Sequence, residues 1–142
     1  GGMITTLTAI PPQEATFSPI EVWENKNQDR DYVISIEVPE FTSVCPMTGL
    51  PDFGTLLIDY VPDKGCIELK AFKYYILSYR NVGIFYENVV NRILDDLVEA
   101  CQPKYMRIRG VFTPRGGIST NVTVLHQQPG FELTTLDRLT EA

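Results

Sequence analysis

Hydrophobic and polar positions between residues 30 and 128 repeat with two different periods. Alternation with a period of two is typical of strands, because successive side chains point to opposite faces. Four segments alternate in this way: 32–38, 55–61, 105–112 and 118–126. A period of 3.6 predicts a helix over 84–101, with one apolar stripe and a polar face opposite it. The stripe consists of Phe85, Val89, Val90, Ile93, Leu94, Leu97, Val98 and Cys101.

Shorter signals connect these elements. Pro39 is expected to end the first strand, and the turn at 62–65 is expected to lead into a hairpin strand over 66–70. A short helix is predicted over 71–79. The order is therefore strand, loop, hairpin, helices, hairpin. It predicts an α+β fold with an antiparallel sheet and the helices on one face.

The length of 142 residues fits one domain. Residues 1–29 are proline-rich and weakly patterned, and predict an extended N-terminal arm, with Gly1-Gly2 interpreted as a tag remnant. The catalytic domain is expected at 30–128 and a tail at 129–142. The chain shows neither a signal peptide nor an apolar run long enough for a membrane span, so a cytoplasmic location is expected.

Charge and composition narrow the range of partners. Lys and Arg number 12 against 18 Asp and Glu, a net charge of −6, which disfavours nucleic acid as a partner. Three cysteines make no disulfide framework, and a single histidine makes a His-rich metal site nearly impossible within one chain. An antiparallel sheet of four or five strands has open edges, so a ring-shaped homo-oligomer is expected.

Two candidates for chemistry lie in the loop over 40–53. Cys45 sits among prolines, a glycine and hydroxyl side chains, where free backbone N–H groups can stabilise a thiolate. Asp52 follows seven residues later, and a carboxyl group near a thiolate can move its proton. The alternative that the residues alone leave open is a small buried cysteine and a solvated aspartate, since free cysteines are often core residues. Cys66 and Cys101 are interpreted as core residues.

A second group lies at the predicted strand-to-helix junction. Lys70 and Lys73, with Tyr74 beside them, suit the phosphates of a cofactor, but a solvated amphipathic edge has the same pattern. Glu87, off the apolar stripe of the helix, suits the N–H donors of a purine-like base, or is simply a surface residue. Arg115 precedes two glycines and suits a phosphate, or is an ordinary turn residue.

Four segments carry a family resemblance. The run from Glu40 to Phe53, with its Cys45 and Asp52, resembles the active-site segment of the 7-cyano-7-deazaguanine reductases, the QueF family of nitrile reductases. All eight positions from Glu68 to Tyr75 fit that family's NADPH-binding signature. The segments 78–81 and 112–117 are also similar, and the whole resemblance spans about 30–127 in order. The length matches the short, single-module type.

The resemblance implies a tunnelling fold whose sheets join into a barrel, with two stacked pentamers and active sites between subunits. It also implies NADPH-dependent reduction of the nitrile of 7-cyano-7-deazaguanine to an aminomethyl group, a step toward queuosine in tRNA. Cys45 would form a covalent thioimide and Asp52 would move protons. No metal is implied. Glu87, Tyr86 and Glu68 would bind the substrate, and Lys70, Lys73, Tyr74 and Arg115 would bind NADPH.

Two positions depart from the family pattern. Tyr86 stands where the family commonly has histidine, so it cannot act as an imidazole acid, although it can stack on or hydrogen-bond to a purine-like ring. Val89 stands where some members have a second cysteine, so no protective disulfide is expected there. The alternatives are the related amidinotransferase that acts on the nitrile base within tRNA, and a non-catalytic protein of this fold that binds purine or pterin.

Overall fold

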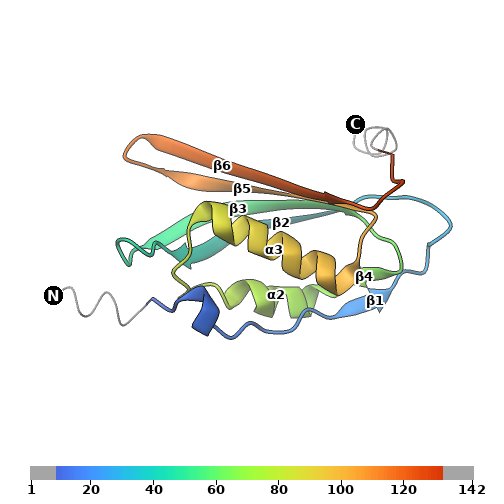
Figure 1. Ribbon diagram of the computed structural model, residues 1–142, viewed down its shortest axis with the longest axis horizontal. Helices are drawn as coiled ribbons and strands as arrows, with labels where there is room; N and C mark the ends of the chain where they lie inside the picture. Colours follow the sequence, from blue (N-terminus) through green and yellow to red (C-terminus); the bar gives the residue numbers. More distant parts are fainter. Residues whose placement is uncertain (1–8, 133–142) are drawn as a thin grey trace.

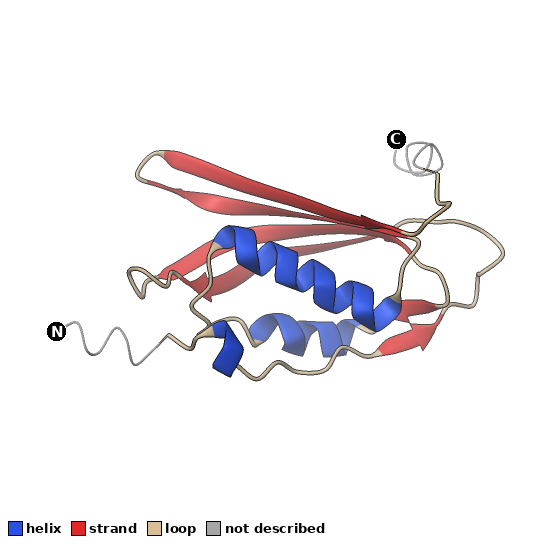
Figure 2. Cartoon of the chain, viewed as in Figure 1, coloured by secondary structure: helices blue, strands red, loops and turns tan. Residues whose placement is uncertain are grey.

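The fold is a four-stranded antiparallel sheet with two helices on one face (Figures 1 and 2). The computed structural model describes residues 9–132. The strand order is β2-β3-β5-β6, so both hairpins of the sheet connect strands that are neighbours in sequence. The sheet consists of β2 (Ile34–Val44), β3 (Pro51–Val61), β5 (Tyr105–Arg115) and β6 (Ile118–Gln127). The predicted α+β class with helices on one face is confirmed.

The helix α3 (Tyr86–Cys101) packs its apolar stripe against β5 and β6. Most of the predicted stripe is buried, and Cys101 is a core residue whose burial raises the pKa of its thiol to about 12. The prediction is wrong at Phe85, which is 44% exposed because it precedes the helix as its N-cap. Gln102 ends the helix in the left-handed conformation, just before Pro103.

Pro39 does not end the first strand, contrary to prediction. The strand β2 continues to Val44, and its register against β3 shifts between Val38 and Phe41. A bulge of this kind leaves a residue unpaired, so a proline without an N–H group costs no ladder hydrogen bond there. The irregular loop therefore shrinks from the expected 40–53 to the six residues between β2 and β3.

The predicted hairpin of 55–61 with 66–70 is also wrong. The short strand β4 (Gly65–Ile67) pairs instead with β1 (Val22–Glu24), which lies in the predicted irregular arm. The helix α2 (Leu69–Leu77) begins earlier than expected, because Glu68 caps it. The Glu68 carboxylate accepts hydrogen bonds from the backbone N–H groups of Lys70 and Ala71, at 3.0 and 2.5 Å. Lys70 is therefore a helix residue and not a strand residue.

Part of the N-terminal arm is packed against the helices. The arm begins with a single 3₁₀ turn, η1 (Pro12–Glu14). Further along, the ring centroid of Phe17 lies 4.7 Å from that of Tyr79, and the Arg92 guanidinium lies over the Phe17 ring, 4.3 Å from its centroid. Trp23, by contrast, is 63% exposed. None of the helices in the described part of the chain is long and apolar enough to span a membrane.

Candidate active site

The hairpin of β2 and β3 brings Cys45 and Asp52 to the same end of the sheet. Asp52 lies directly opposite Ser43, and Cys45 follows Ser43 by two residues. The loop between the strands is closed by the Cys45 N–H group, which donates to the Leu50 carbonyl at 2.9 Å, and by the Gly49 N–H group, which donates to the Cys45 carbonyl at 2.8 Å. Cys45 and Asp52 are seven residues apart in sequence because one begins this tight hairpin loop and the other lies just after it.

The environment of Cys45 favours its thiolate. A hydrogen bond from the Thr48 side chain is the main cause that lowers the pKa of this thiol, and the backbone N–H groups of Thr48 and Met47 act in the same direction. Partial burial and the negative charge of Asp52 oppose this effect. Cys45 is half-buried and so remains accessible. A partly exposed thiol with a lowered pKa is the usual state of a nucleophilic cysteine.

Asp52 is buried, with 5% of its surface exposed, and two side chains from other elements reach its Oδ1 atom. The Tyr86 hydroxyl, at the start of α3, donates to Oδ1 at 3.2 Å. The Arg115 guanidinium, at the end of β5, lies 3.2 Å from the same oxygen and also donates to the Pro51 carbonyl. The structure thus brings together three of the predicted site residues. Arg115, which is expected from the sequence to bind a phosphate, forms an ion pair with the Asp52 carboxylate in this structure.

An aromatic pair supports this group. The rings of Tyr86 and Phe112 are stacked with centroids 4.0 Å apart and planes 15° from parallel. Phe112 lies so close to Gly54 and Gly110 that a Cβ atom at either glycine would be 2.8 Å from its ring. Sequence reasoning missed Phe112 and Thr48 as parts of the site. Glycines inside two strands were the available signal for Phe112, because such glycines often mark a close approach.

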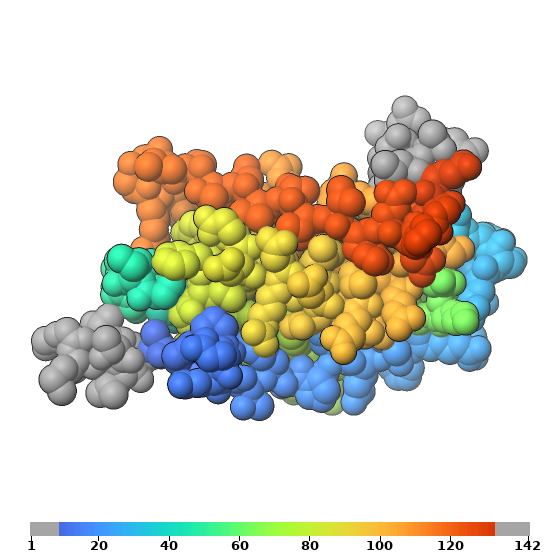
Figure 3. All heavy atoms as spheres, in the orientation of Figure 1, coloured from blue at the N-terminus to red at the C-terminus, as the bar shows by residue number. Residues whose placement is uncertain are grey.

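Several large apolar side chains around the Cys45 loop are exposed. Figure 3 shows the loop, the start of α3 and the tip of the β5–β6 hairpin gathered at one end of the molecule. The exposed residues there are Met47, Leu50, Phe53, Phe85 and Ile118. Glu87, in the first turn of α3, is also exposed. The Ser43 hydroxyl is fully buried and has no hydrogen-bond partner among the described residues.

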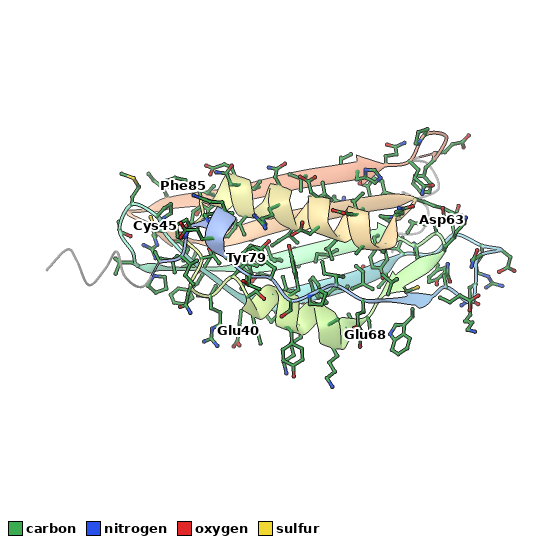
Figure 4. All side chains as sticks on the ribbon, turned by 60° about the horizontal axis from the view of Figure 1, so that its bottom comes forward. Glu40, Cys45, Asp63, Glu68, Tyr79 and Phe85 are labelled. Atoms are coloured by element: carbon green, nitrogen blue, oxygen red, sulfur yellow. The ribbon has the colours of Figure 1, made fainter. Side chains whose placement is uncertain are left out.

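The candidate cofactor residues lie elsewhere. Lys70, Lys73 and Tyr74 are exposed on α2. Glu68, which precedes them, lies well away from Cys45, toward the other end of the molecule (Figure 4). Within one chain, therefore, the structure does not bring Glu68 to the candidate nucleophile.

Between the two ends, a cavity of about 660 Å³ lies beside the C-terminal half of α2. Arg80 and Glu40 contribute its charged groups, and Phe53 and Phe112 contribute aromatic walls. Within residues 9–132, no group of three or more His, Cys, Asp or Glu side chains is arranged to hold a metal ion.

An α+β fold that brings a partly exposed cysteine with a lowered thiol pKa near a buried carboxylate has the arrangement used by enzymes with a nucleophilic cysteine. The model of the family described as QueF-like protein matches residues 51–130. The chain belongs to this family.

Relatives named NADPH-dependent 7-cyano-7-deazaguanine reductase are similar over most of the chain. The protein of Chlorobaculum tepidum is 63% identical over 77% of this chain and 93% of its own length. That of Chlorobaculum parvum is 65% identical over 74% and 90% of the two chains. That of Elusimicrobium minutum is 55% identical over 80% and 86%.

Among solved structures, the archaeosine synthase QueF-Like in its apo form has a similar fold. Its TM-score is 0.62 at 22% identity, covering 66% of this chain and 91% of that one.

Proposed function

We propose that this chain is an NADPH-dependent reductase that converts the nitrile of 7-cyano-7-deazaguanine into an aminomethyl group. Relatives that are 55–65% identical over about three quarters of the chain carry that activity in their names. The observation that carries the proposal in this molecule is the pairing of Cys45, whose thiol pKa is lowered, with the buried carboxylate of Asp52.

In the proposed first step, the Cys45 sulfur forms a bond to the nitrile carbon, and the carbon–nitrogen triple bond becomes a double bond. The proton of the thiol passes through Asp52 to the nitrogen, so the product is a neutral thioimide and no proton is lost. The addition turns a poor hydride acceptor into a good one. Glu87, exposed two residues after Phe85, is proposed to accept hydrogen bonds from the N–H groups of the base.

When bound, NADPH would supply the two hydrides that the reduction needs, one for the thioimide carbon and one for the imine that remains after Cys45 departs, and each nitrogen would take up one proton from the solvent, relayed by Asp52. After the first reduction the carbon–sulfur bond breaks and Cys45 regains its proton. Lys70 and Lys73 fit the phosphates of NADPH, because both ammonium groups are exposed on consecutive turns of α2. Tyr74, exposed beside them, offers an aromatic surface. Arg115 remains a candidate for the phosphates, although it pairs with Asp52 here.

The first step is tested by mixing the protein with 7-cyano-7-deazaguanine in the absence of NADPH and measuring the intact mass. We expect a gain of one substrate mass in the wild type and none in Cys45→Ala. Cys66→Ala is the matched control, because Cys66 lies on β4 and is expected to leave the adduct intact. No adduct in the wild type at neutral pH would contradict the proposal. Two NADPH molecules should then be oxidised for each product formed.

We also propose that the complete site lies between two copies of the chain, in a ring-shaped homo-oligomer. This is supported by the separation of Glu68 from Cys45 and by the edges of the sheet, where β2 and β6 each have one neighbour within the chain.

Mixed oligomers test this arrangement. Cys45→Ala should be inactive, and a Lys70→Ala, Lys73→Ala double variant should be nearly inactive at low NADPH. Co-expression of the two should restore about a quarter of the wild-type activity, since each site would draw one intact half from each of two copies. Activity no higher than that of the separate variants would show that each chain holds a complete site.

A further inference from the structure

The two contacts on Asp52 converge on a single oxygen atom. The Tyr86 hydroxyl and the Arg115 guanidinium each lie 3.2 Å from Oδ1, and they come from different elements, α3 and β5. Because the carboxylate is buried, each contact does more to fix its orientation than it would in water. A carboxylate held through one oxygen presents its other oxygen in a defined direction.

The tyrosine contact is itself held by packing. The Tyr86 ring is stacked on Phe112, and Phe112 fits into space left by the missing side chains of Gly54 and Gly110. Burial, and then the charge of Asp52, raise the pKa of Tyr86, so its hydroxyl keeps its proton and stays a donor at neutral pH. The hydroxyl therefore has little freedom to leave the carboxylate.

The arginine contact depends on the hairpin turn. Arg115 is followed by Gly116 and Gly117, whose positive φ angles of 57° and 77° are strained for other residues. The guanidinium also donates to the carbonyl of Pro51, which is the residue just before Asp52. Arg115 thus joins the end of β5 to the start of β3 through two contacts, one with the Pro51 backbone and one with the Asp52 side chain.

We propose that Tyr86 and Arg115 are positioning residues that anchor Oδ1 of Asp52, so that Oδ2 is the atom that takes the proton from Cys45 and gives it to the substrate nitrogen. This inference rests on the proposed function. It explains how a tyrosine serves at a position where the resemblance leads one to expect a histidine: the hydroxyl donates to the carboxylate, as an imidazole N–H group would.

The test is the rate of adduct formation with 7-cyano-7-deazaguanine in the absence of NADPH, so that hydride transfer plays no part. Tyr86→Phe keeps the ring stack and removes only the hydroxyl, and we expect it to slow the adduct about tenfold. Tyr86→His should restore most of the lost rate. Arg115→Gln should slow the adduct to a similar extent, and Arg115→Lys should recover part of it. Arg109→Gln, on the same strand β5, is the matched control and should react like the wild type.

Two further measurements separate positioning from a general structural effect. Binding of the nitrile, measured in a Cys45→Ala background, should stay within about twofold of its value when Tyr86→Phe is added. Alkylation of Cys45 by iodoacetamide should be unchanged in Tyr86→Phe. It should be slower in Arg115→Gln, because the charge of Asp52 then opposes the Cys45 thiolate without a counter-charge.

The outcomes are distinct. A wild type that forms no adduct contradicts the proposed function and the anchoring together. A wild type that forms the adduct, with Tyr86→Phe and Arg115→Gln reacting equally fast, leaves the function standing and overturns the anchoring. A loss of nitrile binding that accounts for the slower adduct would also overturn it, since Tyr86 would then be a binding residue.

Discussion

The two ends of this domain present their candidate residues in different ways. At the Cys45 end, side chains from β3, α3 and β5 contact one another around a buried carboxylate, next to the loop that carries Cys45. At the start of α2, the candidates come from one short stretch of sequence and stand side by side on a helix. The first group is assembled by tertiary packing, whereas helical periodicity alone arranges the second. Substitutions should therefore affect the two ends in different ways.

Removal of the nucleophile should have the largest effect. Cys45→Ala is expected to lower turnover by about 10⁴-fold or more, because no other group can form the thioimide. Binding of NADPH, measured by fluorescence titration, should be unchanged if the two ends are independent. A large loss of NADPH affinity would show that the ends communicate through the fold.

Removal of the two lysines should weaken NADPH binding and leave the chemistry at Cys45 unchanged. Lys70→Ala combined with Lys73→Ala is expected to raise the KM for NADPH about 30-fold, since each lost charge-assisted contact contributes about 1 kcal/mol. The rate of adduct formation without NADPH should not change. Lys26→Ala, an exposed lysine in an ion pair with Glu24, is the control and should leave the KM at its wild-type value. An unchanged KM in the double variant would disprove the cofactor assignment.

Crowding the space around Phe112 should destabilise the domain, whereas a similar substitution on β4 should have little effect. In Gly110→Ala the new Cβ atom would lie 2.8 Å from both the Phe112 ring and Val90, and should lower the free energy of unfolding by about 2 kcal/mol. Gly65→Ala, on β4, would meet its nearest atoms at 3.5 Å and should cost little. Urea denaturation measures both. Equal stability of the two variants would mean that Phe112 adjusts freely.

The smallest effect is expected from the hydroxyl that stabilises the thiolate. Thr48→Val removes the main cause that lowers the pKa of Cys45, so that pKa should rise and the thiolate fraction at neutral pH should fall. Alkylation of Cys45 at pH 7 should slow about three- to tenfold, and the difference should vanish at a pH above both pKa values. Thr123→Val, exposed on β6, is the control. A pH profile of alkylation that does not shift would assign the lowered pKa to the backbone N–H groups alone.

Sequence periodicity predicted the α+β class, the long helix and all four strands of the sheet, because alternation and helical stripes depend only on which face is buried. It did not predict the pairing of β4 with β1, which depends on where the chain returns in space. The helix start was misplaced for a local reason: the strand-like pattern of Glu68 and Lys70 is overridden by the Glu68 cap.

The candidate site also combines features that the sequence determines with contacts that only the fold creates. The sequence by itself determined the residue types: a cysteine and an aspartate seven positions apart, and two lysines one helical turn apart. Only the tertiary structure decided that Arg115 and Tyr86 meet on one oxygen of Asp52, and that Phe112 supports them through Gly54 and Gly110. These residues are far apart along the chain, and the packing of α3 against the sheet brings them together. A pattern along the chain records periods and spacings, but contacts across the sheet depend on the register and packing that folding creates.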